Sequence, residues 1–255
     1  MTNLLHTDAL TIHIGQARVC TQLTLALQAG DCVGVLGKNG SGKTTLLRSL
    51  AGLHPHDSGS ISLHGKTIER FSLQSLATQR SLLLQEETTL FPGTVAQSVL
   101  TGRHPYLATW QQETTDDYAI VDQAMQTMDI SHLRDRQLTT LSGGERRRVS
   151  IARLLAQQTD VMLLDEPLNH LDLHHQIALL HHLRQCSDAG RVIIFSSHDP
   201  SLVDRFCNHA LLLFGNGEQQ FGESSEILTE ETLSRLYQHP VQLLSNDQQR
   251  IFVAR

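Results

Sequence analysis

The chain has 255 residues, 20 of them basic and 26 acidic, which gives a formal net charge of −6. Hydrophobic residues make up 40% of the sequence, enough to bury a core, and this excludes a disordered, collagen-like or disulfide-scaffold chain. The longest apolar runs, such as Val192–Phe195 and Ala210–Phe214, are far shorter than the roughly 20 residues of a membrane span. Because the net charge is negative, the chain has no overall positive potential that would attract nucleic acid. The four cysteines are far apart and show no paired spacing, and the N-terminus has no basic region followed by an apolar stretch, as a signal peptide would have. Both observations predict a chain of the reducing cytosol.

Alternating apolar residues around Thr11–Ile14 and Leu23–Leu27 predict a small antiparallel sheet at the start of the chain. Beyond it, short apolar runs alternate with segments of helical periodicity, and this pattern indicates a parallel sheet covered on both faces. The predicted strands are Val33–Leu36, Ser60–Leu63, Ser81–Gln85, Val161–Asp165, Val192–Ser196 and Ala210–Phe214, and the predicted helices are Lys43–Ala51, Glu145–Gln157, Asp172–Cys186 and Pro200–Phe206.

The segment from Leu90 to Leu141 breaks this alternation, because it is polar, helical in pattern and contains no convincing strand. It predicts a helical insertion between two strands of the parallel sheet. Further on, His174–His175 and His181–His182 lie at helical spacing among polar residues. Without a cysteine or carboxylate constellation beside them, they favour a solvated helix surface over a metal site.

A phosphate-binding loop lies between the first buried strand and the helix that follows it. The residues Gly37, Lys38, Asn39, Gly40, Ser41, Gly42, Lys43 and Thr44 match G-x-x-x-x-G-K-[ST] in full, with Thr45 next. The glycines allow backbone N–H groups to turn toward phosphate oxygens at a helix N-terminus. Lys43 is expected to reach the β- and γ-phosphates and Thr44 to bind Mg²⁺. The motif predicts a nucleoside-triphosphate site rather than a plain glycine turn.

Two carboxylates follow the apolar run Val161–Leu164. The first, Asp165, is expected at the carboxyl edge of the sheet, where ligands of open α/β sheets bind, and is predicted to bind Mg²⁺. Successive side chains of a strand point to opposite faces, so Glu166 is free for another task. We predict that Glu166 accepts a proton from the attacking water or orients it. The alternative role is a helix cap.

A second helix start suited to an anion lies at Ser142, Gly143 and Gly144, directly before Glu145–Gln157. One chain with one triphosphate does not need two such starts. Two chains related by a two-fold axis use both, because each phosphate loop then faces the partner's Ser-Gly-Gly segment. The same residues also fit an ordinary helix cap.

Taken together, these motifs resemble the ATP-binding subunits of ABC transporters over essentially the whole chain. Gly37–Thr44 is similar to Walker A, Val161–Glu166 to Walker B and Leu141–Glu145 to the signature motif. The resemblance implies ATP and Mg²⁺ as cofactors and a homodimer in the ATP-bound state. It also implies an α/β fold, with a P-loop NTPase (RecA-like) core, an N-terminal antiparallel β subdomain and an inserted α-helical subdomain.

The resemblance also divides the single predicted domain, 1–255, into parts. The core with the β subdomain covers 1–88 and 159–220, the helical subdomain with the signature motif covers 89–158, and a C-terminal helix and tail cover 221–255.

Further residues gain roles from the same resemblance. Gln85 fits the Q-loop glutamine, which senses Mg²⁺ and couples to the transport partner, and His198 fits the switch histidine on the γ-phosphate. Leu168–Asp172 resembles the D-loop, with Asp172 at the shared nucleotide site. The implied catalytic residues are Lys43, Gln85, Glu166 and His198, and the implied metal ligands are Thr44, Gln85 and Asp165.

The adenine contact departs from the family, which usually stacks the base on an aromatic side chain of the early sheet. No Phe, Tyr or Trp precedes Phe71, and by register the position falls at Ile14, with His13 and Arg18 nearby. We expect an aliphatic contact from Ile14, or a contact from a His or Arg face.

The helical insertion and the tail resemble one group within the family. Phe91–Val95, Thr101–Tyr106 and Leu228–Val241 are similar to importers for iron-siderophore complexes, haem and cobalamin. This implies an integral membrane permease, an indirect periplasmic binding protein and a peripheral position on the cytoplasmic face of the inner (plasma) membrane. No nucleic acid partner is expected.

The permease is expected to dock near Gln85, Phe91 and Arg103–Trp110. The aromatic residues Phe91, Tyr106 and Trp110 fit either a docking surface for a membrane partner or a small helical core.

Two other functions remain open. The first is a soluble ABC-type ATPase that acts without a permease, in repair, translation or cofactor assembly. Proteins of that kind often carry two cassettes, a coiled-coil insertion or a basic arm, and this sequence has none of these features. A small-molecule phosphotransferase accounts for Lys43 and Asp165 but leaves the signature motif, Leu168–Asp172 and His198 without a purpose. We therefore predict the ATP-hydrolysing subunit of an importer for iron-siderophore, haem or cobalamin-type metal chelates.

Overall fold

The computed structural model describes residues 3–85, 92–108, 110–246 and 249–255. Its central sheet has six strands, and five of them run parallel while β10 is antiparallel to β9. In spatial order these strands are β10 (Gln219–Glu223), β9 (His209–Leu213), β3 (Cys32–Gly37), β8 (Val192–Ser197), β7 (Val161–Leu164) and β6 (Arg80–Leu83). The predicted α/β class with a parallel sheet is confirmed.

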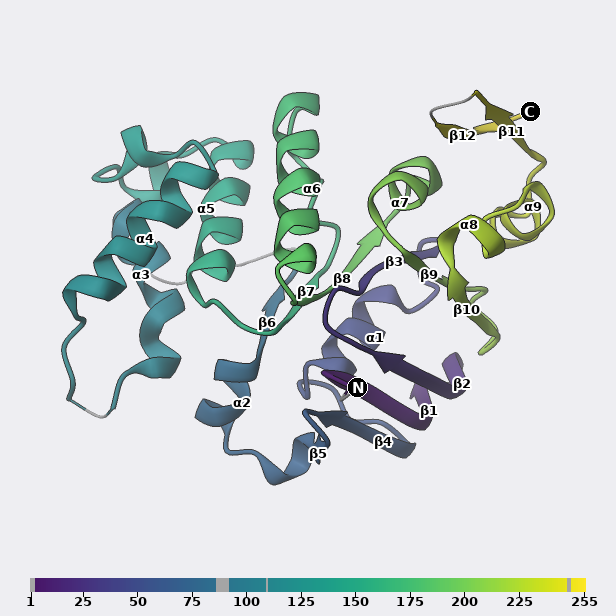
Figure 1. Ribbon diagram of the computed structural model, residues 1–255, viewed down its shortest axis with the longest axis horizontal. Helices are drawn as coiled ribbons and strands as arrows, with labels where there is room; N and C mark the ends of the chain where they lie inside the picture. The colour runs from purple at the N-terminus through teal and green to yellow at the C-terminus, as the bar shows by residue number, and fades with distance from the viewer. Residues whose placement is uncertain (1–2, 86–91, 109, 247–248) are drawn as a thin grey trace.

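An antiparallel sheet lies below the central sheet in Figure 1. It contains β2 (Ala17–Leu27), β1 (Leu5–Ile14), β4 (Ser58–Leu63) and β5 (Lys66–Thr67), in that order. The early antiparallel sheet was therefore predicted correctly.

One predicted strand belongs to a different sheet than expected. Ser60–Leu63, which the sequence grouped with the parallel strands, lies within β4 and pairs antiparallel with β1. After it the chain turns at His64 and Gly65, both in the left-handed region with φ of 50° and 75°. The chain therefore returns directly as β5 instead of crossing over through a helix.

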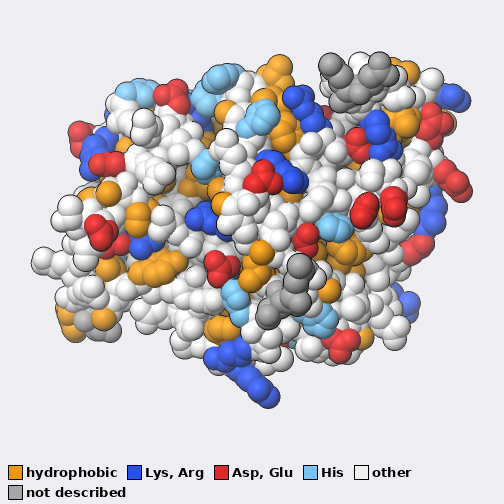
Figure 2. Space-filling view, in the orientation of Figure 1, with side chains coloured by type: hydrophobic (Ala, Val, Ile, Leu, Met, Phe, Trp, Pro, Cys, Tyr) orange, Lys and Arg blue, Asp and Glu red, His pale blue; other side chains and the backbone are white. Residues whose placement is uncertain are grey.

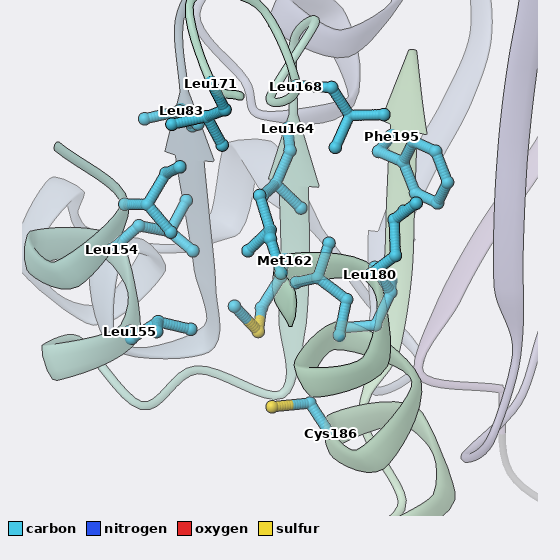
Figure 3. Close-up of a cluster of buried hydrophobic side chains, with 14 of the residues drawn as sticks. Leu83, Leu154, Leu155, Met162, Leu164, Leu168, Leu171, Leu180, Cys186 and Phe195 are labelled. Carbon is cyan, nitrogen blue, oxygen red and sulfur yellow. The ribbon is translucent and has the colours of Figure 1, made fainter. Parts of the chain in front are cut away.

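Alternate residues of the parallel strands pack on opposite faces of the central sheet, as the two-residue period of a strand requires. In β8, Val192 and Ile194 pack toward the antiparallel sheet and α1 (Lys43–Leu50). Ile193 and Phe195 belong to the core on the other face, which α6 (Leu173–Asp188) and α7 (Pro200–Phe206) cover. Figure 3 shows this second core, with Leu180 of α6 beside Phe195 and Met162.

A helical segment lies between β6 and β7, as predicted. Three of its helices begin with a Thr or Ser that forms a capping box with the residue three positions on. The helices are α3 (Val95–Leu100), the 3₁₀ helix η2 (Thr101–Tyr106), α4 (Thr115–Thr127), η3 (Ser131–Leu133), η4 (Leu138–Thr140) and α5 (Gly143–Ala156). Before β6 come η1 (Ile68–Arg70) and α2 (Leu73–Gln79).

Helix α7 packs directly on β3, and a glycine makes this approach possible. A Cβ atom on Gly34 would lie 2.3 Å from Cγ1 of Val203, well inside van der Waals contact. The strand that leads into the phosphate loop therefore also supports the helix that follows His198.

The C-terminal region contains α8 (Ser224–Ile227), α9 (Glu230–Tyr237) and a hairpin of β11 (Val241–Ser245) and β12 (Arg250–Ala254). The hairpin was not predicted, since the sequence indicated only a helix and a tail. It is fastened to α7, because Arg250 forms an ion pair with Asp204 at 3.0 Å and the amide of Phe252 donates to Ser201 Oγ at 3.0 Å. Among the helices of the described residues, none combines the length and apolar character that crossing a bilayer requires.

Candidate active site

The phosphate loop connects β3 to α1, as the motif predicted. Gly40 and Gly42 have φ of 78° and 99°, in the left-handed region that favours glycine. The hydroxyl of Ser41 is buried and has no hydrogen-bond partner among the described residues. A buried donor left unpaired inside a glycine-rich turn fits a loop that closes around an anion.

Lys43 is almost fully buried and folds back over this loop. Its Nζ donates to the carbonyl oxygens of Gly37 at 2.8 Å and Lys38 at 3.2 Å. Burial lowers the pKa of Lys43, while the nearby carboxylates of Glu166 and Asp165 act in the opposite direction. The ammonium therefore lies at the loop, ready to contact an anion there.

Asp165 lies directly after β7, at the carboxyl edge of the sheet, and is 1% exposed. Its Oδ2 accepts a hydrogen bond from Thr44 Oγ1 at 2.6 Å, and its Oδ1 accepts one from Ser196 Oγ at 2.7 Å. The structure thus brings together Thr44 and Asp165, the hydroxyl and carboxylate predicted to bind Mg²⁺.

Glu166 is the centre of a hydrogen-bonded cluster. Gln85 Nε2 donates to its Oε2 at 3.0 Å, and His198 Nε2 lies 2.9 Å from its Oε1. Its own amide donates to Ser196 Oγ at 2.7 Å, and its backbone is left-handed, with φ of 46°. The side chain is 10% exposed, so the carboxylate is held in a defined direction and largely shielded from solvent.

Two residues of this cluster were missed by the site prediction. Asn169 Nδ2 donates to Glu166 Oε2, and Ser196 connects Asp165 with the backbone of Glu166. A polar residue at the end of the apolar strand Val192–Ser197 was the available signal for Ser196. Asn169 gave no comparable signal, because its contact with Glu166 depends on the loop conformation after β7.

One cavity of about 420 Å³ joins these groups, within the range of roughly 300–1,000 Å³ that small-molecule sites occupy. Ile14, predicted to contact adenine, is 47% exposed and lies in its wall. The cavity is lined by Ile14, Asn39, Gly40, Gly42, Lys43, Thr44, Thr45, Gln85, Glu166, Asn169 and His198.

Ser142, Gly143, Gly144 and Asp172 do not line this cavity. Ser142 and Asp172 are helix caps: Ser142 Oγ accepts from the amide of Glu145, and Asp172 Oδ1 accepts from the amide of His175. The hydrogen bond from the amide of Ser142, with a smaller contribution from Arg136, lowers the pKa of Glu145. The cap interpretation of Ser142 therefore holds within one chain.

The predicted docking segment combines buried and exposed residues. Arg103 is 8% exposed and pairs with Asp117 at 2.8 Å, so it stabilises the helical segment instead of facing a partner. Trp110 is 97% exposed and Tyr106 is 38% exposed, and this rules out a core position for Trp110. Phe91 lies outside the described residues. On the face drawn in Figure 2, the described acidic and basic side chains are interspersed rather than separated by sign.

Comparison with known proteins identifies the family of this chain. A family model described as ABC transporter matches residues 20–169. The chain belongs to the ABC transporter family. It is 37% identical over 229 residues to a hemin import ATP-binding protein of Nocardia farcinica, covering 90% of this chain and 79% of the relative. It is 36% identical to the ferric enterobactin transport ATP-binding protein of Escherichia coli, covering 90% of this chain and 85% of the relative.

Solved structures of the family give the same result. A transporter described as of metal-chelate type, in an inward-facing conformation, matches with a TM-score of 0.85 and 30% identity, over 99% of this chain and 98% of that one. The ATP-binding subunits of ABC transporters bind ATP and hydrolyse it in support of transport, so this chain is an ATPase of that class. The P-loop NTPase fold is confirmed, and neither the soluble factor nor the phosphotransferase is favoured.

Proposed function

We propose that this chain is the ATP-hydrolysing subunit of a membrane importer for iron-siderophore, haem or cobalamin-type metal chelates. The hemin and ferric enterobactin relatives support this group of cargoes, and so does a cobalamin import ATP-binding protein of Halobacterium salinarum, which is 34% identical over 90% of this chain and 57% of that protein. The observation that carries the catalytic part is that residues of the phosphate loop line one cavity together with Gln85, Glu166 and His198.

The triphosphate binds in the loop Gly37–Thr44, where backbone N–H groups and the N-terminus of α1 favour negative charge. The ammonium of Lys43 contacts the phosphates, and Ile14 in the cavity wall contacts adenine. Mg²⁺ fits the oxygen ligands present here, because it prefers hydroxyl and carboxylate oxygens such as those of Thr44 and Asp165. When bound, it neutralises phosphate charge, with Gln85 as a further ligand.

In the reaction, water attacks the γ-phosphorus and the bond from that phosphorus to the β-phosphate oxygen breaks. Glu166 orients this water and accepts its proton on a carboxylate oxygen. His198, within 2.9 Å of Glu166 Oε1, contacts the γ-phosphate and aligns the carboxylate. Lys43 and the loop amides stabilise the charge on the transferring phosphoryl group.

Two copies of the chain complete each site. Because Ser142, Gly143, Gly144 and Asp172 do not line their own chain's cavity, they are available to a nucleotide held by another copy. Two ATP molecules then lie between two chains, each bound by the phosphate loop of one copy and the Ser-Gly-Gly helix start of the other. Hydrolysis removes the charge that holds the copies together, and the pair opens.

The movement passes to a permease near Gln85, Tyr106 and Trp110. An almost fully exposed tryptophan four residues after a partly exposed tyrosine suits a partner surface, since aromatic residues are enriched at interfaces. This placement implies a peripheral position on the cytoplasmic face of the inner membrane and indirect work with a periplasmic binding protein. Co-purification of the tagged chain with a membrane protein of several spans tests it.

Replacing Glu166 tests the catalytic proposal. Glu166→Gln keeps the shape and the hydrogen-bonding cluster but removes the proton acceptor, so we expect turnover to fall by about 10²- to 10⁴-fold. The Kd for ATP, measured by calorimetry, should stay within about twofold, because the phosphates bind at the loop. Light scattering should show a dimer that persists with ATP. Full activity in this variant would remove Glu166 from its role, and Glu231→Gln on the exposed face of α9 is the control.

A further inference from the structure

Arg147, in the second turn of α5, is a buried arginine that the site prediction did not use. It is 6% exposed, and its guanidinium reaches main-chain oxygens instead of solvent. The acceptors are Leu84 O at 2.7 Å, Gln85 O at 3.3 Å, Asp165 O at 2.8 Å, Glu166 O at 2.7 Å and Pro167 O at 3.4 Å.

These oxygens belong to two stretches of chain that leave the sheet side by side. Leu84 and Gln85 follow β6, and the other three residues follow β7, its parallel neighbour. The strands stay joined as far as the hydrogen bond from Asp165 N to Leu83 O at 2.9 Å. Beyond that point the guanidinium bridges them. Its planar fork of five N–H donors suits acceptors on both sides, and a charged donor makes stronger hydrogen bonds than a neutral one.

The bridged backbone holds the two side chains that meet at the cavity. Gln85 and Glu166 are joined through their side chains at 3.0 Å. The amide of Glu166 is held by Ser196 Oγ and its carbonyl by Arg147 Nη2, so both of its peptide groups are fixed while φ is 46°. Together these contacts define the direction of the carboxylate.

The same arginine belongs to the helix that begins at Ser142. Helix α5 is 14 residues long, and its cap lies five positions before Arg147 in the sequence. One side chain therefore connects the Ser-Gly-Gly helix start with the backbone of Gln85 and Glu166.

We propose that Arg147 is a positioning residue that couples α5 to the backbone of Gln85 and Glu166, so that a displacement of the Ser142 helix start re-aims the Glu166 carboxylate. This inference rests on the proposed roles of Glu166 and Ser142 in hydrolysis. It assigns to Arg147 the alignment of the hydrolytic groups and no contact with nucleotide.

The test is Arg147→Lys in the full-length chain. Lysine keeps the positive charge, but its single ammonium cannot hold both strand ends as a planar fork does. We expect kcat for ATP hydrolysis to fall by about 10- to 100-fold, as for a small misplacement of reacting groups. KM and the Kd for ATP should remain within about twofold, because the proposed phosphate contacts come from the loop between β3 and α1 and from Lys43, and not from the strand ends that Arg147 bridges.

Arg148→Lys is the matched control on the same helix. Arg148 is also largely buried and also donates to main-chain oxygens, with Nη1 at 2.7 Å from Asp129 O and 3.3 Å from Met128 O. Those acceptors lie after α4, within the helical segment, so kcat of this variant should stay within about twofold of the unchanged chain.

A kcat of Arg147→Lys within twofold of the unchanged chain overturns the proposal, as does an equal loss in Arg148→Lys. Should Arg147→Lys not fold, as judged by circular dichroism, Arg147→Gln takes its place with the same expected split between kcat and Kd. Failure of both variants to fold assigns Arg147 to stability alone and also overturns the proposal. Glu166→Gln is measured in parallel: if it is fully active, the proposed function fails, whereas an inactive Glu166→Gln beside an active Arg147→Lys defeats only the coupling role.

Discussion

Single side chains determine what the nucleotide base contacts. Ile14 presents an aliphatic surface to the cavity, while the neighbouring His13 is held elsewhere: its amide and ring Nδ1 lie 2.7 and 3.1 Å from Asp57 Oδ2. This favours Ile14 over the ring of His13 as the side chain of this strand that is expected to meet the base. An aromatic ring at the same position would add a stacking contact of about 0.5–1.5 kcal/mol.

Ile14→Tyr is therefore expected to tighten nucleotide binding. The stacking contact corresponds to a Kd for ATP lower by about 2- to 10-fold, measured by calorimetry with the full-length chain. Leu53→Tyr is the control, because Leu53 is 57% exposed and does not line the cavity. An unchanged or weaker Kd in Ile14→Tyr would show that the base lies elsewhere.

Among single residues, the sequence predicted those whose role follows from their spacing within a short motif. Lys43, Thr44, Asp165 and Glu166 lie within contiguous motifs, and the structure brings all four to one cavity or its edge. Arg147 could not be found in this way, because its partners are backbone oxygens far away in the sequence. Which oxygens it meets depends on how α5 packs against β6 and β7.

The elements of the helical segment are joined by one buried ion pair. Arg103 of η2 binds Asp117 of α4 through Nε at 2.8 Å and donates from Nη1 to Ala156 O, at the end of α5, at 2.9 Å. The hydrogen bond from Arg103, followed by those from Thr114, lowers the pKa of Asp117 to about 2. The guanidinium of Arg103 also lies over the ring of Tyr106, 4.2 Å from its centroid, so the pair supports one aromatic residue of the proposed docking surface.

Removing one partner of this pair should destabilise the chain. Arg103→Met leaves Asp117 buried without its cation, and we expect the free energy of unfolding to fall by about 3–5 kcal/mol in urea titrations at pH 7. Arg134→Met, which breaks an exposed pair with Asp122, should cost about 1 kcal/mol or less. An equal loss in both variants would contradict the assignment.

The same pair predicts a pH dependence. A carboxyl whose pKa is lowered on folding contributes stability above its unfolded pKa of 3.8 and loses it as the pH falls toward about 2. The difference between Arg103→Met and the unchanged chain should therefore be smaller at pH 3 than at pH 7. A difference that stays constant over this range would show that the charge of Asp117 does not contribute.

Elements that bury a periodic apolar face were predicted well, and the exposed C-terminal hairpin was not. Helices α5, α6 and α7 lie within a few residues of their expected bounds, because each buries a face with helical period. The hairpin of β11 and β12 has short strands that are half exposed, so its stability comes from packing on α7 and α9. A contact with a distant helix leaves no periodic pattern in the sequence.

In the proposed dimer, the start of α5 faces the nucleotide of the other copy. A Cβ atom on Gly143 would meet no other atom within 4 Å, so the start of α5 is open to solvent. Gly144 differs, since a Cβ there would lie 2.9 Å from His170 O. An aspartate at position 143 suits the N-terminus of the helix, yet it places a negative charge where the partner's phosphates are expected.

Mixing two inactive variants tests whether the sites are shared. Lys43→Ala removes the phosphate ligand and Gly143→Asp repels the partner's nucleotide, so each variant alone should be inactive. In a mixed dimer one site combines the intact loop of the Gly143→Asp copy with the intact helix start of the Lys43→Ala copy. With random pairing, about half of the dimers have one of two sites intact, and we expect up to about a quarter of the unchanged activity. A mixture no more active than the sum of its components contradicts shared sites.

The placement of His198 relative to the phosphate loop depends partly on Gly34, which carries a hydrogen atom in place of a side chain. Strand β3 ends at Gly37 and supports α7 through Gly34, and α7 starts two residues after His198. A larger side chain at position 34 would meet Val203, and we expect it to push α7, and with it the segment that carries His198, away from the strand. The proposed catalytic alignment therefore depends partly on a residue inside the core, Gly34, whose lack of a side chain allows α7 to pack directly on β3.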